Sequence, residues 1–248
     1  MMRRNLFRSS NPVLLGLDQG FASDTPATYG GVVAKSLFLF TILAFTGGIV
    51  AFNQDFFFTN QWILFAAMIG GFITILFSRT PSAAKVGAPI YAALQGIVIG
   101  MIAVVYNFIA PGIVESAILL TLSIFLVMLI LYATGLVRVG PIFTRVVYAG
   151  LGGLVLFSFV AIVVSFFSPG FDELFYGNLQ FILVISLIGA ALASLMILVD
   201  LDRITMIVRS GADESVEWIA ALGLMVTIIW LFLEILRILL VFASRSRD

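Results

Sequence analysis

The sequence of 248 residues contains no cysteine and no histidine. Without cysteine the chain has no disulfide bond and no thiolate nucleophile, and without histidine it has no imidazole to bind a metal or exchange protons near neutral pH. Any proton chemistry must therefore use carboxylates, lysine, arginine or tyrosine. We expect no cofactor and no tightly bound metal ion.

Charged residues are also scarce. They make up 10% of the chain, whereas about a quarter is usual in soluble domains. Hydrophobic residues make up 62%, and the mean hydropathy is +1.18. A water-soluble fold of this length cannot hide so much apolar surface behind so few charges, so the composition predicts an integral membrane protein in contact with the lipid bilayer. The formal net charge is zero, which gives no indication of nucleic-acid binding.

Seven apolar stretches are long enough to cross a bilayer, since a spanning helix needs about 20 mainly apolar residues. Segments with proline, glycine or asparagine separate them, among them "SRTPS", "GLVRVGP" and "RSGADES". Strands of a membrane barrel would alternate and run only about 9–11 residues. The sequence therefore predicts an all-α bundle of seven transmembrane helices. They are expected near 31–52, 61–78, 86–107, 113–135, 142–168, 178–206 and 216–243.

The chain is predicted to form one transmembrane domain over 29–243, between a cytoplasmic tail at 1–28 and a short tail at 244–248. The first 28 residues hold no long apolar core ending in a cleavage site, so the first helix is expected to direct insertion. Basic residues concentrate in the N-terminal tail and in alternate connections, which predicts a cytoplasmic N-terminus. The C-terminal tail "ASRSRD" is also basic, which conflicts with an outside location after seven spans.

The stretch "GIVIG" has small residues four positions apart, at Gly96 and Gly100. This spacing lets two helices approach closely. The partner is either another helix of the same chain, as we expect, or a second copy.

Two acids and a base interrupt the apolar stretch "ASLMILVDLDRITMIV" at 193–208. Asp200 lies eleven residues before Gly211, or about 17 Å of helix, which places it in the cytoplasmic half of the membrane. A charged aspartate at a helix centre costs about 2.5–3.5 kcal/mol. Asp200 is therefore expected to face the protein interior, to pair, or to stay protonated. Asp202 lies on a different helical face, and Arg203 is three positions from Asp200.

The last apolar stretch contains further polar residues. Glu234 and Arg237 are three positions apart and therefore adjacent on one helical face. Thr227 precedes Glu234 by seven residues and points the same way, at roughly the depth of Asp200 across the hairpin. Glu234 would lie about 10 Å further outward. These side chains are predicted to line a polar seam between the last two helices.

Two interpretations of these charges are open at this point. In the first, the seam is an ion pathway with pH-sensing carboxylates, a transient cation can bind at Asp200, and two arginines gate it by ion pairing. In the second, each arginine only neutralises the acid three positions before it. The pathway residues of the first interpretation are Asp200, Asp202, Thr227 and Glu234, and its gating arginines are Arg203 and Arg237.

The same hairpin carries a family resemblance. "ILVDLDRI" followed by "GLMVTIIWLFLEILRILL" resembles the last two helices of the Bax inhibitor-1 family, also called the transmembrane Bax inhibitor motif family. "SSNPVL" and "TYGGVVAKS" resemble a bacterial branch of it. The resemblance implies a seven-helix bundle with helix seven near the centre, and a pH-dependent calcium leak governed by two aspartates on helices six and seven. Asp200 matches the first aspartate, and Arg237 matches the arginine after the core of helix seven.

The chain departs from the family pattern at three positions. Thr227 stands where the second aspartate would be, Asp202 where the family has glutamine, and Val199 where it has an aromatic residue. A latch of two carboxylates at one level is therefore not intact, and Glu234 can substitute only from two turns away. Two close carboxylates in a poorly solvated site would share a proton. Calcium prefers six to eight oxygen ligands, which favours a passing ion over a tight site.

The leading hypothesis is a non-enzymatic channel or leak protein of the bacterial inner membrane that passes calcium or another cation. A second is a non-conducting regulator that binds a membrane protease or another membrane protein, in which cytoplasmic charged elements and not the seam carry the function. A third, an intramembrane hydrolase, would need facing aspartates or a Ser–Lys pair, and we find neither at a convincing depth. A proton-coupled transporter is a further alternative, although no inverted repeat stands out.

Overall fold

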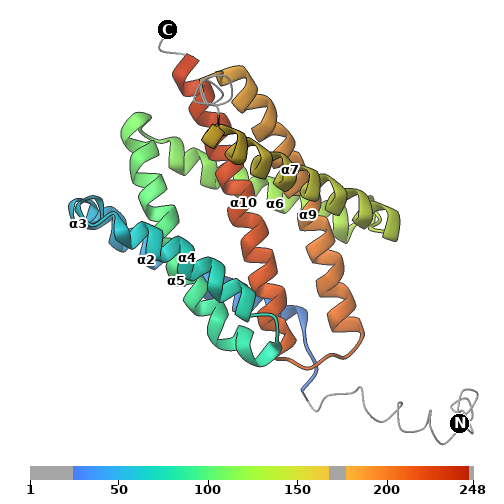
Figure 1. The fold of residues 1–248 in the computed structure, drawn as a ribbon. Helices are drawn as coiled ribbons and strands as arrows, with labels where there is room; N and C mark the ends of the chain where they lie inside the picture. Colours follow the sequence, from blue (N-terminus) through green and yellow to red (C-terminus); the bar gives the residue numbers. More distant parts are fainter. Residues whose placement is uncertain (1–24, 168–176, 246–248) are drawn as a thin grey trace, which may run out of the picture.

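The computed structural model describes residues 25–167 and 177–245. Within these two segments the chain forms eight α-helices and no β-strand (Figure 1). The helices are α2 (Tyr29–Phe52), α3 (Gln54–Thr59), α4 (Trp62–Phe77), α5 (Pro81–Ile109), α6 (Ile113–Ala133), α7 (Pro141–Phe167), α9 (Leu179–Arg209) and α10 (Val216–Arg245). Most of the predicted N-terminal tail, and the end of the C-terminal tail, lie outside the described residues.

Local sequence signals fix where several helices begin and end. Thr28 caps α2 because its side chain accepts a hydrogen bond from the backbone N–H of Gly31. α5 begins with Pro81, which is well suited to the first helical position. Asn178 caps α9 in the same way as Thr28 caps α2. α9 is followed by Gly211 at φ 67°, a conformation that glycine adopts without strain, and this turn leads into α10.

Six of the described helices are long and apolar enough to cross a membrane, namely α2, α5, α6, α7, α9 and α10. Each lies on a predicted span. α3, the helix at 54–59, was not predicted, because "FNQD" was interpreted as a connection.

The predicted count of seven spanning helices is not confirmed. The stretch expected at 61–78 forms α4, which has only 16 residues. A helix of that length rises about 24 Å, less than the roughly 30 Å of a bilayer's hydrocarbon core. The polar pair Asn60 and Gln61 separates α4 from α3, so the apolar run does not extend in the N-terminal direction.

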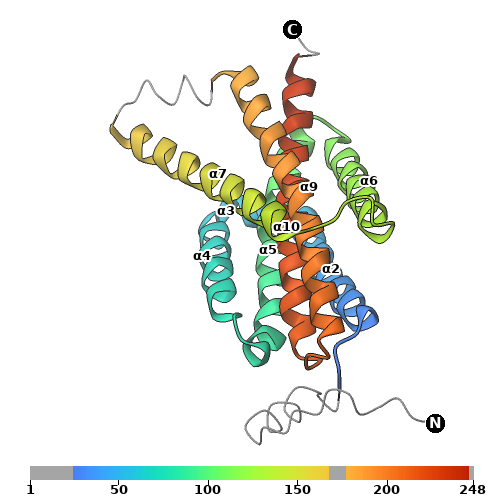
Figure 2. The same cartoon turned by 90° about the vertical axis from the view of Figure 1, so that its right-hand side faces the viewer.

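The apolar core lies where α10 packs against α2, α5, α6 and α9. Leu39, Ile197 and Met225 are fully buried there. α7 packs against α9 and lies at the side of the bundle (Figure 2). Large apolar side chains also cover the outside, and Phe52 and Phe108 are each 91% exposed. Helices that are apolar on their outer faces are expected in a membrane, where lipid covers those faces.

Glycines bring α2 and α5 together. A Cβ atom at Gly100 would lie 2.9 Å from the Cα atom of Gly47, and one at Gly96 would lie 2.6 Å from the backbone oxygen of Leu43. Such distances are too short for a side chain, so the "GIVIG" spacing serves packing within the chain, as we expected.

The segment before α2 is tied to the turn between α9 and α10. Pro26 and Asp213 form an isolated antiparallel bridge, the N–H of Ala27 donates to the oxygen of Ala212 at 2.7 Å, and the N–H of Glu214 donates to the oxygen of Thr25 at 2.9 Å. The start of α2 and the α9–α10 turn therefore lie at one end of the bundle, and α10 ends at the other (Figure 1).

Candidate functional site

A buried carboxyl group lies between α9 and α10. Asp200 on α9 is only 6% exposed, and the hydroxyl of Thr227 on α10 donates a hydrogen bond of 2.5 Å to its Oδ2 atom. Thr227 is itself buried. The two residues meet because the short turn containing Gly211 folds α10 back along α9, so residues at similar distances from the turn come to one level. The pair is the centre of the candidate site.

Asp200 does not form an ion pair with Arg203. The ion pairs in the described part of the chain are Lys35–Glu217 and Glu234–Arg237. The guanidinium of Arg203 lies 5.4 Å from the ring centroid of Tyr148 on α7, where it makes a cation–π contact. The interpretation in which Arg203 pairs with the acid three positions before it is therefore not what the structure shows.

Glu234 forms a second buried acidic position on α10. Arg237 donates to its Oε2 atom at 3.0 Å, and the indole N–H of Trp230 donates to its Oε1 atom at 3.1 Å. The carboxyl lies directly against Gly189 of α9, where a Cβ atom would be 2.8 Å from the carboxyl carbon. Glycine at 189 thus leaves space for the acid within the helix interface.

The two acidic positions are separate. Gly189 precedes Asp200 by eleven residues on α9, which corresponds to about 16 Å of helix. The polar side chains therefore form two positions, one nearer the α9–α10 turn at Asp200 and Thr227 and one further from it at Glu234 and Arg237. Both lie at the contact between α9 and α10.

Asp202 belongs to a different surface. The hydroxyl of Tyr132 on α6 lies 3.2 Å from the Oδ1 atom of Asp202 and 2.9 Å from the hydroxyl of Thr205. Asp202 is half-buried and faces α6, whereas Asp200 faces α10. The spacing of two residues predicted this difference of face, but no local pattern pointed to Tyr132 as a partner of Asp202.

Sequence reasoning missed one buried cluster. Glu217, at the start of α10, is 3% exposed and pairs with Lys35 of α2 at 2.5 Å. Its Oε1 atom accepts a hydrogen bond of 2.7 Å from the N–H of Thr28. Lys35 also lies over the ring of Trp218, 5.5 Å from its centroid. These partners are up to 189 residues apart in sequence, so no local pattern could have joined them.

No group of three or more acidic side chains that could hold a metal ion occurs in the part of the chain that the structure describes. Asp200 and Glu234 are each the single carboxyl group at their position between α9 and α10, with the hydroxyl of Thr227 beside the first and Trp230 and Arg237 beside the second.

The helices and the buried polar positions define the class of this protein as a multi-span membrane protein. The family model described as "Bax inhibitor 1 like" matches residues 9–244, nearly the whole chain, and the chain belongs to this family. A comparison with curated proteins gives no match.

Proposed function

We propose that this protein is a cation-conducting channel or leak protein, that calcium is the ion to test first, and that pH controls its conduction through Asp200. One observation carries the proposal: Asp200 is a buried carboxyl inside a long apolar helix, and no cation pairs with it in the described part of the chain. An ionisable side chain within a membrane span is costly and marks ion or proton pathways. Membership of the Bax inhibitor-like family supports the same proposal.

In this proposal the hydrogen bond from Thr227 to Asp200 holds α9 and α10 together in the closed form. A change in the protonation of Asp200, or the arrival of a cation, alters that hydrogen bond and lets the two helices separate. Glu234 is a second acidic step, and its ion pair with Arg237 stabilises the closed form. Asp202 is a further acidic step on the face of α9 toward α6, at a level nearer the α9–α10 turn.

We further propose the membrane arrangement that this mechanism needs. α4 spans the membrane as the seventh helix in spite of its length, α10 is the central helix, and the protein lies in a bacterial inner membrane with its N-terminus in the cytoplasm. The contacts of α10 with α2, α5, α6 and α9 support the central position.

The test is calcium flux from liposomes loaded with a calcium-sensitive dye, followed between about pH 6 and 8. Wild type is compared with Asp200→Asn, and with Asp55→Asn as a control in which an exposed acid of α3 is neutralised. We expect flux that depends on pH in wild type and in the control, and a changed pH dependence in Asp200→Asn. Absence of flux at every pH from folded protein would overturn the proposal and favour the regulator that binds a membrane protein.

A further inference from the structure

A cavity of about 530 Å³ lies at the end of the bundle where α2 begins and α6 and α9 end. It is separate from the contact between Asp200 and Thr227, and the proposed conduction mechanism uses only its Asp202. α6 ends at Ala133 and α9 at Arg209, where the apolar stretches give way to polar residues, so the cavity lies at the level expected for the membrane–water boundary. Its polar lining consists of Tyr29, Tyr132, Arg138, Asp202, Thr205 and Arg209.

Two unpaired arginines give the cavity its charge. Arg138 follows α6, and Arg209 is the last residue of α9. Both are exposed, and neither forms an ion pair or a hydrogen bond with another described residue. Asp202 is the acidic side chain of the lining, so with the two arginines the lining carries a net charge of +1. Free guanidinium groups bind phosphate oxygens strongly and with defined geometry.

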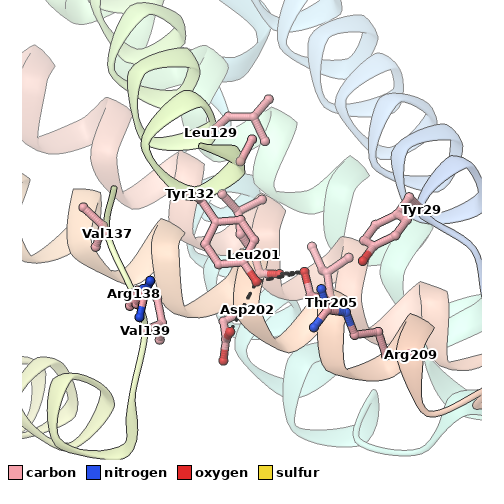
Figure 3. A pocket seen from close by; sticks show the side chains of 12 residues that line it. Tyr29, Leu129, Tyr132, Val137, Arg138, Val139, Leu201, Asp202, Thr205 and Arg209 are labelled. Atoms are coloured by element: carbon pink, nitrogen blue, oxygen red, sulfur yellow. Dashed lines mark hydrogen bonds between the residues drawn. The ribbon is translucent and has the colours of Figure 1, made fainter. Parts of the chain in front are cut away.

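Hydroxyl groups lie between the arginines. Figure 3 shows the hydroxyl of Tyr29 and the guanidinium of Arg209 directed toward Thr205, with Arg138 on the far side of Tyr132. The contacts of Tyr132 with Asp202 and Thr205 hold the polar floor of the cavity in place. A ligand with both a phosphate and hydroxyl groups would find partners for each here.

The remaining walls are apolar. They include Leu129, Val137 and Leu201, and the neighbouring outer surface of α6 carries further exposed apolar side chains such as Leu126 and Ile130. A soluble phosphate ester gains nothing from such walls, whereas the acyl chains of a lipid can lie along them. Basic pockets between helices near the membrane surface are known sites for anionic lipid headgroups.

We propose that this cavity binds the headgroup of an anionic phospholipid, with the phosphate held by Arg209 beside Thr205 and with Arg138 adding positive charge from the far side of Tyr132 (Figure 3). Phosphatidylglycerol fits the lining best, because its phosphate can be bound by the guanidinium of Arg209 and its glycerol hydroxyls can donate to Asp202. Neither arginine takes part in the proposed conduction mechanism, so lipid binding can be tested without a flux measurement.

The experiment measures lipid retained by the purified full-length chain. Protein is delipidated in detergent and then placed in nanodiscs of phosphatidylcholine alone, of phosphatidylcholine with phosphatidylglycerol, or of phosphatidylcholine with phosphatidylethanolamine, and bound lipid is counted by native mass spectrometry. We expect selective retention of phosphatidylglycerol and an increase of the melting temperature with that lipid. Arg209→Gln should weaken retention about tenfold, as for the loss of one charge-assisted hydrogen bond, and Arg138→Gln should weaken it by less.

Two controls separate the site from general charge effects. Arg79→Gln removes an exposed arginine that does not line the cavity and should leave retention unchanged, while Arg138→Lys and Arg209→Lys should keep part of it because the charge remains. Inorganic phosphate alone should not raise the melting temperature. Equal retention of all three lipids, an equal loss in Arg79→Gln, or the same stabilisation by inorganic phosphate would overturn the proposal.

Discussion

A single hydrogen bond makes Asp200 tolerable inside the bundle. An aspartate charged at a helix centre costs about 2.5–3.5 kcal/mol, and a hydrogen bond to a charged group contributes about 1.5–3 kcal/mol. The hydroxyl of Thr227 at 2.5 Å therefore offsets much of the cost of placing the carboxyl there. Thr227 stands at the position expected for the second aspartate of the family pattern, and its hydroxyl donates a hydrogen bond to Asp200, which matches the first.

Replacing Thr227 with valine removes that donor and keeps the shape of the side chain. We expect Thr227→Val to lower the free energy of unfolding by about 1–3 kcal/mol, because the carboxyl is left buried without its hydrogen bond. Denaturant titration in detergent micelles measures the effect.

Thr121→Val is the matched control, since Thr121 is also buried but donates only within its own helix, to the oxygen of Ala117. It should lower the free energy of unfolding by less than about 1 kcal/mol. Equal effects of the two substitutions would argue against a special role of the contact between Thr227 and Asp200.

Gly189 is required where Glu234 lies against α9. We expect Gly189→Ala to destabilise the protein by about 1–3 kcal/mol, because the added methyl group would overlap the carboxyl and push α9 away from α10. Gly223→Ala is the control, since a Cβ atom at Gly223 on α10 meets no other atom within 4 Å. Thermal unfolding of both variants measures the loss of stability. A Gly189→Ala protein as stable as wild type would contradict the close contact between Gly189 and the Glu234 carboxyl.

The hairpin of α9 and α10 is anchored to α2 at the scale of whole elements. The carboxylate of Glu217 forms an ion pair with Lys35 and accepts a hydrogen bond from the N–H of Thr28. Lys35 also donates a hydrogen bond of 3.2 Å to the backbone oxygen of Glu214. A side chain at Gly31 would overlap the Glu217 carboxylate, so α2 approaches α10 closely here. The anchor fixes the end of the hairpin nearest to the turn, and movement between α9 and α10 must occur beyond it.

Removing one partner of the anchor should destabilise the fold about as much as removing both partners. We expect Lys35→Met or Glu217→Gln alone to cost about 1–3 kcal/mol, since each removes the ion pair while the contacts of Thr28 with Glu217 and of Lys35 with Glu214 remain, and the double variant to cost less than the sum. A double-mutant cycle of unfolding free energies measures this coupling. Lys85→Met, at an exposed lysine with no ion pair among the described residues, is the control, and additive single effects would contradict the anchor.

The sequence predicted the helices well because apolar runs and their breaks are local properties. The stretch expected at 113–135 is the helix Ile113–Ala133, and that expected at 216–243 is Val216–Arg245. The common level of Asp200 and Thr227 also followed from counting along two antiparallel helices from a short turn.

The remaining contacts depend on which helices are neighbours, and spacing within a helix carries no such information. Tyr132 reaches Asp202 across 70 residues, and Lys35 reaches Glu217 across 182. Arg203 turned to Tyr148 and not to the acid one turn before it, because α7 packs against that side of α9. Helix packing therefore decided which charges became partners.

At the scale of the whole molecule, the number of membrane crossings depends on α4. If α4 spans, the sequence positions before and after it lie on opposite sides of the membrane. The two ends of α10 lie on opposite sides if α10 itself spans, as its length and composition allow. A short helix can span by local thinning of the bilayer at a modest cost.

The natural absence of cysteine makes the crossing test direct. Single cysteines at Asp55 and Ser82 report on α4, and single cysteines at Ser215 and Ser244 report on α10. We expect a maleimide that cannot cross membranes to label only one member of each pair in sealed vesicles, and both members after permeabilisation. Labelling of positions 55 and 82 from the same side would rule out a spanning α4.

The role of Asp200 can be tested by an infrared titration of protonated carboxyl groups in the reconstituted protein, recorded together with calcium flux at the same pH values. We expect one carboxyl band that titrates with the same midpoint as the flux in wild type and that disappears in Asp200→Asn. A flux midpoint that is unchanged in Asp200→Asn, or a carboxyl band that persists in that variant with the midpoint of the flux, would contradict the assignment of Asp200 as the group that controls conduction.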